Sequence, residues 1–473
     1  MLTLSSCPPD ARVRRLERRL CLYSGLEDFV LLYPLYALLF ADHGLTTAEI
    51  SSLFALWSLA GLVLEVPSGV LADVLSRRLL LIAGPLLTAT GFTLWFTVPS
   101  YGAFAAGFVL WGAGGALRSG AYEALAHDEL ERLGAASRYA RVMGRATAWA
   151  MVAVALSTAA AAPALAVGGL PAIAVASVGS CLLCAAAGAA LPEHRGGGRR
   201  AAGTGPGHGS GGAVDAEAPG PVATLRAGLG EVRRSRPVRR ALLLGVAVTS
   251  VWGALDEYVP LLAASTGVAA TTVPLLALVV WSGLTAGSLL VGRAEGIRSR
   301  DLGLLLAGGA AATALGALSG HPAGFAAVAA GFLVFQLADV LADARLQAAI
   351  TGPSRATVTS LAGLGTSVAT LGTYGAYAGL SAHFAHGGVF ALLALPYLGV
   401  ALALFLRGRV RAVAPQDQVP DARPEPGREG GAAAAPGPGP GAGPQDGPEP
   451  GPAARPQDGP EPGPVVVVPE PGR

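Results

Sequence analysis

The segment from Glu65 to Leu81 reads EVPSGVLADVLSRRLLL and joins two long apolar stretches of the chain. Its polar part is short, because Asp73 ends the first stretch and Arg77 and Arg78 precede the second. Apolar side chains are stable in hydrocarbon, whereas an Asp/Arg loop is stable in water. The segment is therefore typical of two transmembrane helices that meet in a short cytoplasmic loop.

The whole chain has the composition of a membrane protein. Of its 473 residues, 52% are hydrophobic and only 14% are charged, and the mean hydropathy is +0.52. Soluble domains carry about 25% charged residues. These values predict several spans within a lipid bilayer. The net charge of +2 gives no sign of a nucleic-acid partner, and we expect none.

We expect an all-α membrane protein with 12 transmembrane helices in two pseudo-symmetric six-helix bundles. A spanning helix needs about 20 mostly apolar residues. Runs of this length cover residues 20–40, 48–70, 79–98, 101–125, 142–163 and 170–191, and then 240–263, 272–291, 302–319, 323–344, 357–380 and 385–406.

These runs divide the chain into five parts. We expect a cytoplasmic arm at 1–19, an N-terminal bundle at 20–191, a cytoplasmic central loop at 192–238 and a C-terminal bundle at 239–406. Residues 407–473 are rich in Pro and Gly, and they bury too little apolar surface to fold. We therefore expect a disordered cytoplasmic tail there.

The placement of arginine supports this topology. All 33 Lys and Arg residues are arginine. Between the spans they fall in every second connection, while the alternate connections have none. Connections rich in Lys and Arg lie on the cytoplasmic side of a membrane. We therefore expect a multi-pass protein of the cell membrane with both termini in the cytoplasm.

Two pairs of adjacent acids lie inside predicted spans, Glu27–Asp28 in the first and Asp256–Glu257 in the seventh. A charge at the centre of a span costs about 2.5–3.5 kcal/mol, so it normally faces a cavity or a partner. Adjacent residues point about 100° apart, so at least one acid of each pair should face inward. We interpret these acids as proton-coupling or substrate-cavity groups. The alternative is that they only hydrogen-bond neighbouring helices.

The two acid pairs are expected at different depths in the membrane. The sequences LEDFV at 26–30 and LDEYV at 255–259 are similar. However, Asp28 comes 9 residues after Arg19, whereas Glu257 comes 17 residues after Arg240. We therefore do not take the similarity as a sign of an internal repeat.

Glu65 lies deep in the second span, two residues before Pro67. Proline removes a backbone hydrogen bond and kinks a helix. The Glu65 side chain either caps that defect, lines the cavity or pairs with Arg118 of the fourth span. Arg118 and Glu123 also suggest a buried ion pair.

The end of the tenth span carries a similar arrangement. Asp339 and Asp343 are four residues apart, as are Glu123 and His127 in the fourth span, so each pair shares one helix face. We therefore expect Asp339 and Asp343 to belong to the buried ion-pair groups as well.

Aromatic residues of the spans either line a hydrophobic pocket or serve as packing and interface anchors. These residues are Tyr33, Tyr36, Trp57, Trp95, Trp111, Trp149, Trp252 and Trp281.

The sequence gives no indication of an enzyme. It has no Gly-x-Ser-x-Gly, no phosphate-binding Gly-Lys-Ser/Thr loop and no HExxH motif. Cys181 and Cys184 have a metal-like spacing, but they lie in an apolar run without a second ligand pair. We expect no enzymatic activity, no cofactor and no metal.

The opening segment resembles the signature of the major facilitator superfamily between helices two and three, Gly-x-Leu-Ala-Asp-Arg-x-Gly-Arg-Arg/Lys-x-x-Leu. Val74 replaces an arginine of the signature, and Ser76 replaces its second glycine. Residues 65–69 and SGAYEALAHDEL at 119–130 look like a drug-efflux-like branch of that superfamily. The matching positions are Gly69, Leu71, Ala72, Asp73, Arg77, Arg78 and Leu81.

The resemblance implies alternating access, with a cytoplasmic gate built from Gly69, Asp73, Arg77, Arg78 and Arg355. Asp73 would dock near the amino end of the eleventh helix, close to Arg355, and hold the gate shut. A carboxylate at a helix amino terminus is also what the helix dipole favours.

We therefore expect a monomeric secondary active transporter that exports a small organic solute in exchange for protons. Within transport, the alternative is solute uptake by proton symport or facilitated diffusion. An alternative from another class is a membrane sensor or scaffold that transports nothing.

Overall fold

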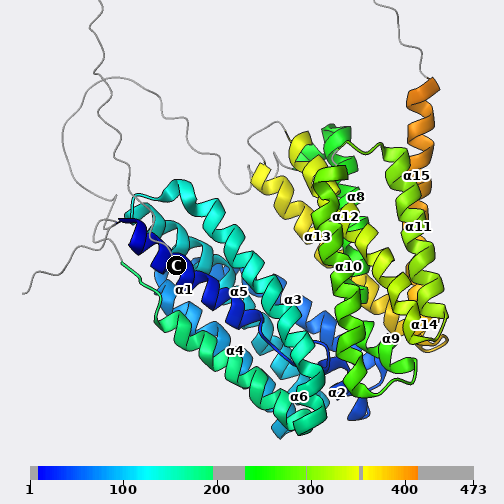
Figure 1. The fold of residues 1–473 in the computed structure, drawn as a ribbon. Helices are drawn as coiled ribbons and strands as arrows, with labels where there is room; N and C mark the ends of the chain where they lie inside the picture. Colours follow the sequence, from blue (N-terminus) through cyan, green and yellow to red (C-terminus); the bar gives the residue numbers. More distant parts are fainter. Residues whose placement is uncertain (1–8, 195–228, 295, 351–354, 414–473) are drawn as a thin grey trace, which may run out of the picture. The chain divides into compact units, whose positions relative to one another are not determined.

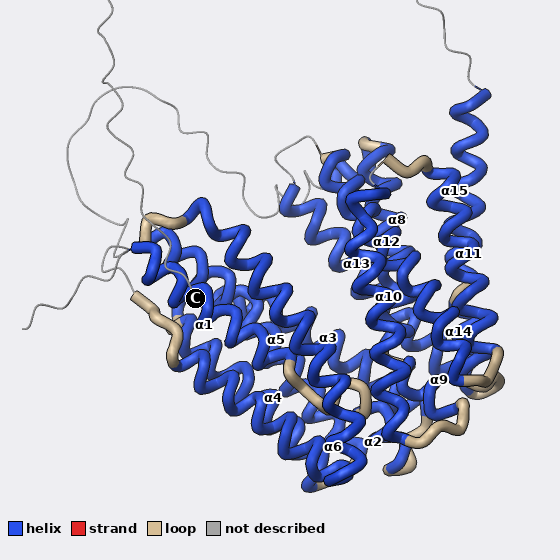
Figure 2. Tube along the Cα trace, viewed as in Figure 1, coloured by secondary structure: helices blue, strands red, loops and turns tan. Residues whose placement is uncertain are grey.

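The computed structural model describes residues 9–194, 229–294, 296–350 and 355–413, so most of the expected central loop and tail lies outside them. The described residues form helices and turns, with no strand (Figure 2). The helices of the first half are α1 (Pro9–Asp28), α2 (Tyr36–Asp42), α3 (Thr47–Val74), α4 (Arg77–Thr97), α5 (Tyr101–Arg132) and α6 (Tyr139–Ala189). The helices of the second half are α8 (Arg236–Asp256), α9 (Val259–Ser265), α10 (Val273–Ala294), α11 (Ser299–Leu318), α12 (Phe325–Ala349), α13 (Arg355–Ser381), α14 (His386–Leu393) and α15 (Leu395–Val413).

Eight helical stretches of the described chain are long and apolar enough to cross a membrane. One of them, α6, contains two spans, because the backbone leaves the helix at Gly169, where φ is 60°. Glycine adopts this conformation without steric cost. The remaining spans are α1 together with α2, α5 and α13, which fits the predicted topology of two six-helix bundles.

The two halves repeat one packing pattern (Figure 1). In the first half α4 and α3 both pack on α5, and α1 packs on α6. In the second half α11 and α10 both pack on α12, and α8 packs on α13. The predicted fold class, an all-α membrane protein with two pseudo-symmetric bundles, is confirmed.

Glycines allow the helices of each half to approach closely. A Cβ atom on Gly84 of α4 would lie 2.8 Å from the backbone oxygen of Gly114 of α5. In the second half, a Cβ atom on Gly331 of α12 would lie 2.7 Å from the backbone oxygen of Gly309 of α11. Close packing stabilises helix pairs in lipid, where apolar burial provides little driving force.

The two ends of the bundles differ. The short helix α9 contacts both α2 and α14 at one end, which we call the short-helix end (Figure 1). The other end carries the α3–α4 connection with Arg77 and Arg78, and we call it the arginine-rich end.

The first and seventh spans are both broken, and an acid pair lies at each break. Helix α1 has 20 residues and ends at Asp28, while α8 has 21 residues and ends at Asp256. A helix of 7 residues follows each break, α2 in the first half and α9 in the second. The acid pairs therefore lie at corresponding helix breaks, and their relative depth in the membrane stays a prediction.

The flanking arginines, from which the expected depths are counted, lie inside the helices. Helix α1 begins at Pro9, within the expected N-terminal arm, and it contains Arg19. Helix α8 begins at Arg236 and contains Arg240. The last arginine before the acids therefore does not mark the start of either helix.

Candidate functional site

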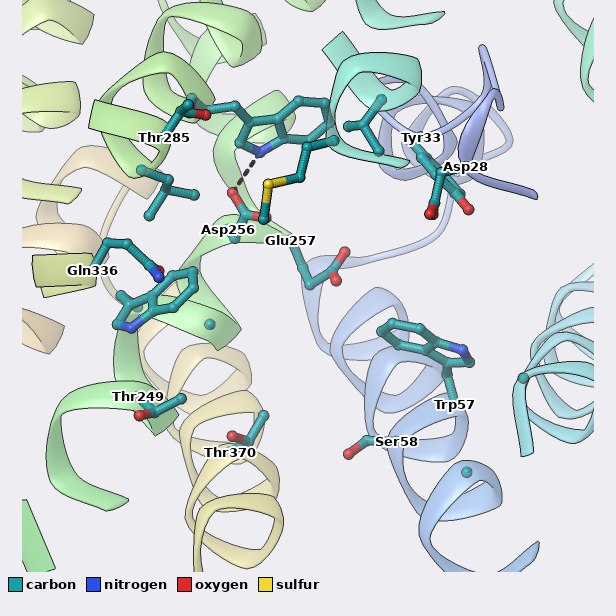
Figure 3. A pocket seen from close by; sticks show the side chains of 18 of the residues that line it. Asp28, Tyr33, Trp57, Ser58, Thr249, Asp256, Glu257, Thr285, Gln336 and Thr370 are labelled. Carbon is teal, nitrogen blue, oxygen red and sulfur yellow. Dashed lines mark hydrogen bonds between the residues drawn. The ribbon is translucent and has the colours of Figure 1, made fainter. Parts of the chain in front are cut away.

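A cavity of about 1350 Å³ lies between the two halves and is lined by both (Figure 3). Its ionisable lining includes every acid predicted for this role. The charged lining residues are Glu27, Asp28, Glu65, Arg118, Asp256 and Glu257. Its aromatic lining residues are Tyr33, Tyr36, Trp57, Trp111, Trp252, Trp281 and Tyr374.

The cavity is closed at the short-helix end by contacts between the halves. The hydroxyl of Tyr258 donates a hydrogen bond to Ser51 Oγ of α3, with 2.7 Å between the oxygens. The ring of Phe54 packs against Tyr258 and Tyr374, with ring centroids 5.3 and 5.8 Å apart. These four residues form the contact that we call the outer seal.

The arginine-rich end of the cavity is open. Glu65 lines the cavity and is exposed. Two other lining residues toward this end are also accessible, because Ser119 of α5 is exposed and Leu289 of α10 is 75% exposed. A solute therefore reaches the acids from the arginine-rich end and not through the outer seal.

The first acid pair is compensated by a cation. Glu27 of α1 forms an ion pair with Arg118 of α5. Both acids lie at the carboxyl end of α1, where the helix dipole disfavours a negative charge. The Arg118 guanidinium offsets that cost. Without it, the partly buried carboxylate of Glu27 would have no cationic partner.

Arg118 does not pair with Glu123 or Glu65, so the expected buried pair with Glu123 is wrong. Glu123 is exposed. It follows Arg118 by five residues, which places the two side chains roughly 140° apart around the helix. Glu65 instead faces the cavity, and the hydroxyl of Ser68 bonds the Glu65 carbonyl oxygen at 2.8 Å, next to Pro67.

The second acid pair has no comparable cation. Asp256 accepts a hydrogen bond from Trp281 Nε1 at 2.8 Å. Glu257 follows it at the end of α8, and its carboxylate faces the cavity between Asp256 and Trp57 (Figure 3). Among the described lining residues Arg118 is the only cation, and it pairs with Glu27. Glu257 therefore lies on the cavity wall without a charged or hydrogen-bonding partner in the described part of the chain.

The acids at the end of α12 do not form buried ion pairs, contrary to expectation. Asp339 accepts a hydrogen bond from Thr249, which lines the cavity. Asp343 is exposed and lies 3.4 Å from the side-chain nitrogen of Gln347. The spacing of four residues places both acids on one face of α12, but only Asp339 contacts the neighbouring helix α8.

One of the predicted gate residues, Arg77, contacts residues of its own half. Arg77 forms an ion pair with Asp128 and donates to the Ala124 carbonyl oxygen at 3.0 Å. Arg78 is exposed, as is Gly69. The helix-capping residue Ser76 starts α4 by accepting from Leu79 N at 3.2 Å.

The proposed latch between Asp73 and Arg355 stays a prediction, because the Asp73 side chain lies outside the described part of the structure. Arg355 donates to Gln347 Oε1 at 3.3 Å and to the Ile350 carbonyl oxygen at 3.4 Å. Both acceptors belong to its own half.

A polar cluster that was not predicted from the sequence follows the end of α6. Glu193 accepts a hydrogen bond from the backbone N–H of Arg77 at 2.8 Å, at the start of α4. Glu129 is 3% exposed and accepts from His194 N at 2.8 Å and from Arg132 Nε at 3.0 Å. The short charged segment after the sixth apolar run was the available signal.

Glu129 lies beyond the predicted fourth span, and its pKa is shifted by this cluster. Burial raises the pKa of the carboxyl group, but the hydrogen bonds from His194 and Arg132 outweigh burial. The pKa of Glu129 is therefore lowered from its ordinary value.

Of the predicted aromatic residues, most line the cavity and two do not. Trp95 is fully buried within the first half and donates to the Phe104 carbonyl oxygen at 3.1 Å. Trp149 is 56% exposed. The uncharged polar lining was not predicted, because nothing in the sequence shows which face of a helix meets the cavity. It includes Ser58, Thr249, Gln336, Thr366 and Thr370.

A profile of the Major Facilitator Superfamily matches residues 23–352, which is more than half of the chain. The chain belongs to this superfamily. No curated protein sequence matches it.

Solved structures with a similar fold include three transporters. A bacterial homologue of the human lysosomal transporter Spinster, in an inward-facing and unoccupied conformation, is 15% identical with a TM-score of 0.60, over 86% of this chain and 95% of its own. The nucleoside transporter NupG is 12% identical with a TM-score of 0.60, over 85% of this chain and 100% of its own. The POT family transporter PepTSo is 12% identical with a TM-score of 0.59, over 85% and 99%. At these identities the likeness shows the fold alone.

Proposed function

We propose that this major facilitator protein is a secondary active transporter of the cell membrane that exports a small organic solute in exchange for protons. Both termini and the arginine-rich end face the cytoplasm in this proposal. The assignment to a drug-efflux-like branch rests on the resemblance of residues 65–69 and 119–130.

One observation carries the proposal: acid pairs at two equivalent helix breaks face a single cavity. A proton-coupled transporter needs groups that bind a proton on one side of the membrane and release it on the other. Intramembrane carboxyl groups that face a cavity are suited to this task. A sensor or scaffold has no need for ionisable groups at this cost.

The geometry also supports alternating access. The cavity opens at the arginine-rich end, so a solute would enter from the cytoplasm. Export would then require closure of that end and separation of Tyr258 from Ser51 and of Phe54 from Tyr374. A single hydrogen bond and a few ring contacts contribute about 1 kcal/mol each, which a bound solute can offset.

The test is transport by the purified full chain in liposomes with an acidic lumen, using a panel of anionic, neutral and cationic dyes. With the membrane potential clamped at zero, we expect one or more dyes to accumulate inside, up to about tenfold per pH unit for one-for-one exchange. Addition of nigericin, which collapses the pH gradient, should release the accumulated dye. Equal dye levels with and without the gradient would indicate facilitated diffusion, and absence of any movement by folded protein would favour a sensor.

A further inference from the structure

The lining of the cavity carries an unusual balance of charge. Five carboxyl groups face it and one arginine does, among the described residues. The arginine is already paired with Glu27. A cavity with this lining attracts positive charge and repels negative charge.

Two of these acids, Asp256 and Glu257, belong to the second half, which contributes no cation to the lining among the described residues. Glu257 has no cation or hydrogen-bond donor among the described residues, and Asp256 has only the neutral indole N–H of Trp281. A carboxylate at the carboxyl end of α8 is further disfavoured by the helix dipole. These acids therefore need a cation from outside the chain, which is either a proton or a charged solute.

Aromatic rings surround the same space. Trp57 stacks on Trp111 with ring centroids 4.9 Å apart, and both rings line the cavity. The indole nitrogen of Trp252, another lining residue, is buried without a hydrogen-bond partner in the described chain. Indole faces bind cations electrostatically and apolar groups by contact.

We propose that the cargo is an organic cation with aromatic or other apolar bulk, whose charge binds Glu257 and whose apolar part contacts the indole rings of the cavity. This proposal rests on the proposed transport function and names its substrate class. A proton and the cargo occupy the same carboxyl group in turn, so the arrival of one displaces the other. That competition gives exchange of one cation for another without a separate coupling device.

The test uses two probe ions of nearly equal size and opposite charge, tetraphenylphosphonium and tetraphenylborate. Each is titrated separately into the purified full chain, and binding is followed by quenching of tryptophan fluorescence. We expect saturable binding of the phosphonium and none of the borate. The affinity for the phosphonium should fall as the pH is lowered, because protons neutralise the cavity acids. Saturable binding of the borate, or no saturable binding of the phosphonium, would overturn the proposal.

Variants locate the charge that binds the probe. Glu257→Gln should weaken phosphonium binding at least tenfold, which corresponds to about 1.4 kcal/mol. Glu257→Asp, which keeps the charge, should retain most of the affinity. Asp343→Asn removes an exposed acid outside the cavity and serves as the matched control. Equal affinity of Glu257→Gln and the wild type would also overturn the proposal.

Two precautions keep the outcome interpretable. If Glu257→Gln does not fold, the test uses Glu65→Gln, which removes another acid of the same cavity and should also weaken phosphonium binding. The preference of the wild type for the phosphonium over the borate then tests the charge of the cargo. Binding in detergent requires no pH gradient. If the wild type binds the phosphonium but shows no proton exchange, the result would therefore contradict the proposed function alone. Proton-coupled transport of anionic or neutral dyes would contradict the cargo class alone.

Discussion

Tyr258 donates a hydrogen bond to Ser51 across the boundary between the two halves, with 2.7 Å between the oxygens. Tyr258 directly follows Asp256 and Glu257, and both of these acids line the cavity. The outer seal is therefore coupled along the backbone to the groups that we propose to bind protons and cargo. Movement at the helix break between α8 and α9 would reach both.

Tyr258→Phe should weaken the outer seal. The change removes one buried hydrogen bond, worth about 1 kcal/mol, and leaves Ser51 without its donor. We expect the population with the short-helix end open to rise about fivefold. Spin labels on the exposed Ala48 and Ala269, in a background without the 4 native cysteines, should show a larger share of long distances.

Tyr101→Phe is the matched control for this experiment. The hydroxyl of Tyr101 bonds Ser52 Oγ at 2.9 Å, but both residues belong to the first half. The distance distribution should not change in this variant. An unchanged distribution in Tyr258→Phe, or an equal change in both variants, would show that the hydrogen bond does not hold the seal.

Arg118→Gln should destabilise the first half. It leaves Glu27 and Asp28 at the end of α1 without their cation, which costs up to about 3 kcal/mol, the low end of the range for a buried pair. The double variant with Glu27→Gln should recover part of this loss, because the stranded charge is then removed. Thermal unfolding of the four proteins in detergent measures the coupling, with Arg78→Gln as an exposed control. Additive effects would mean that the ion pair contributes nothing.

The number of spans and the acids of the cavity could be predicted from the free energy of placing apolar and charged side chains in a bilayer. Apolar runs of about 20 residues identify spans, and charges inside them are rare enough to be noticed. The partner of Arg118 did not follow, because the sequence does not show how α1 and α5 are rotated against each other. The same limit hid Thr249 and Thr370, whose type alone does not separate a cavity wall from a packed helix face.

The correspondence of the two helix breaks did not follow from the sequence either, for a different physical reason. Depth was counted from the last arginine, but Arg19 and Arg240 lie inside their helices. Long arginine side chains extend along a helix toward water, so the helix itself begins earlier. The similarity of LEDFV and LDEYV was therefore the better guide to the repeat.

Asp28→Asn and Glu257→Gln should separate proton coupling from solute movement. Each removes a protonatable group from the cavity and keeps the size of the side chain. We expect gradient-driven accumulation to fall at least tenfold in one or both, while exchange of labelled against unlabelled solute continues in the variant that still binds it. Glu123→Gln, an exposed acid of α5, is the control. If both cavity variants keep full gradient-driven accumulation, the coupling groups lie elsewhere.

Glu129→Gln should reduce stability in a pH-dependent way. The pKa of Glu129 is lowered in the folded chain by His194 and Arg132, against the effect of burial. The stabilisation is therefore complete above the ordinary carboxyl pKa of about 4.3 and is lost as the pH falls through the lower folded value. Unfolding at pH 7 should show a loss of about 1–3 kcal/mol in the variant. The difference from the wild type should shrink below pH 4, and a difference independent of pH would contradict the assignment.

Two neighbouring glycines of α5 provide the sharpest test of the packing. A Cβ atom on Gly114 would lie 2.6 Å from the backbone oxygen of Gly84 on α4, whereas a Cβ atom on Gly115 meets nothing within 4 Å. Gly114→Ala should therefore force the helices apart and cost about 1–3 kcal/mol. Gly115→Ala should be neutral or slightly stabilising, because alanine favours the helix by up to about 1 kcal/mol. Thermal unfolding of both variants measures the difference, and equal stability would mean that α4 and α5 do not approach as closely as the structure places them.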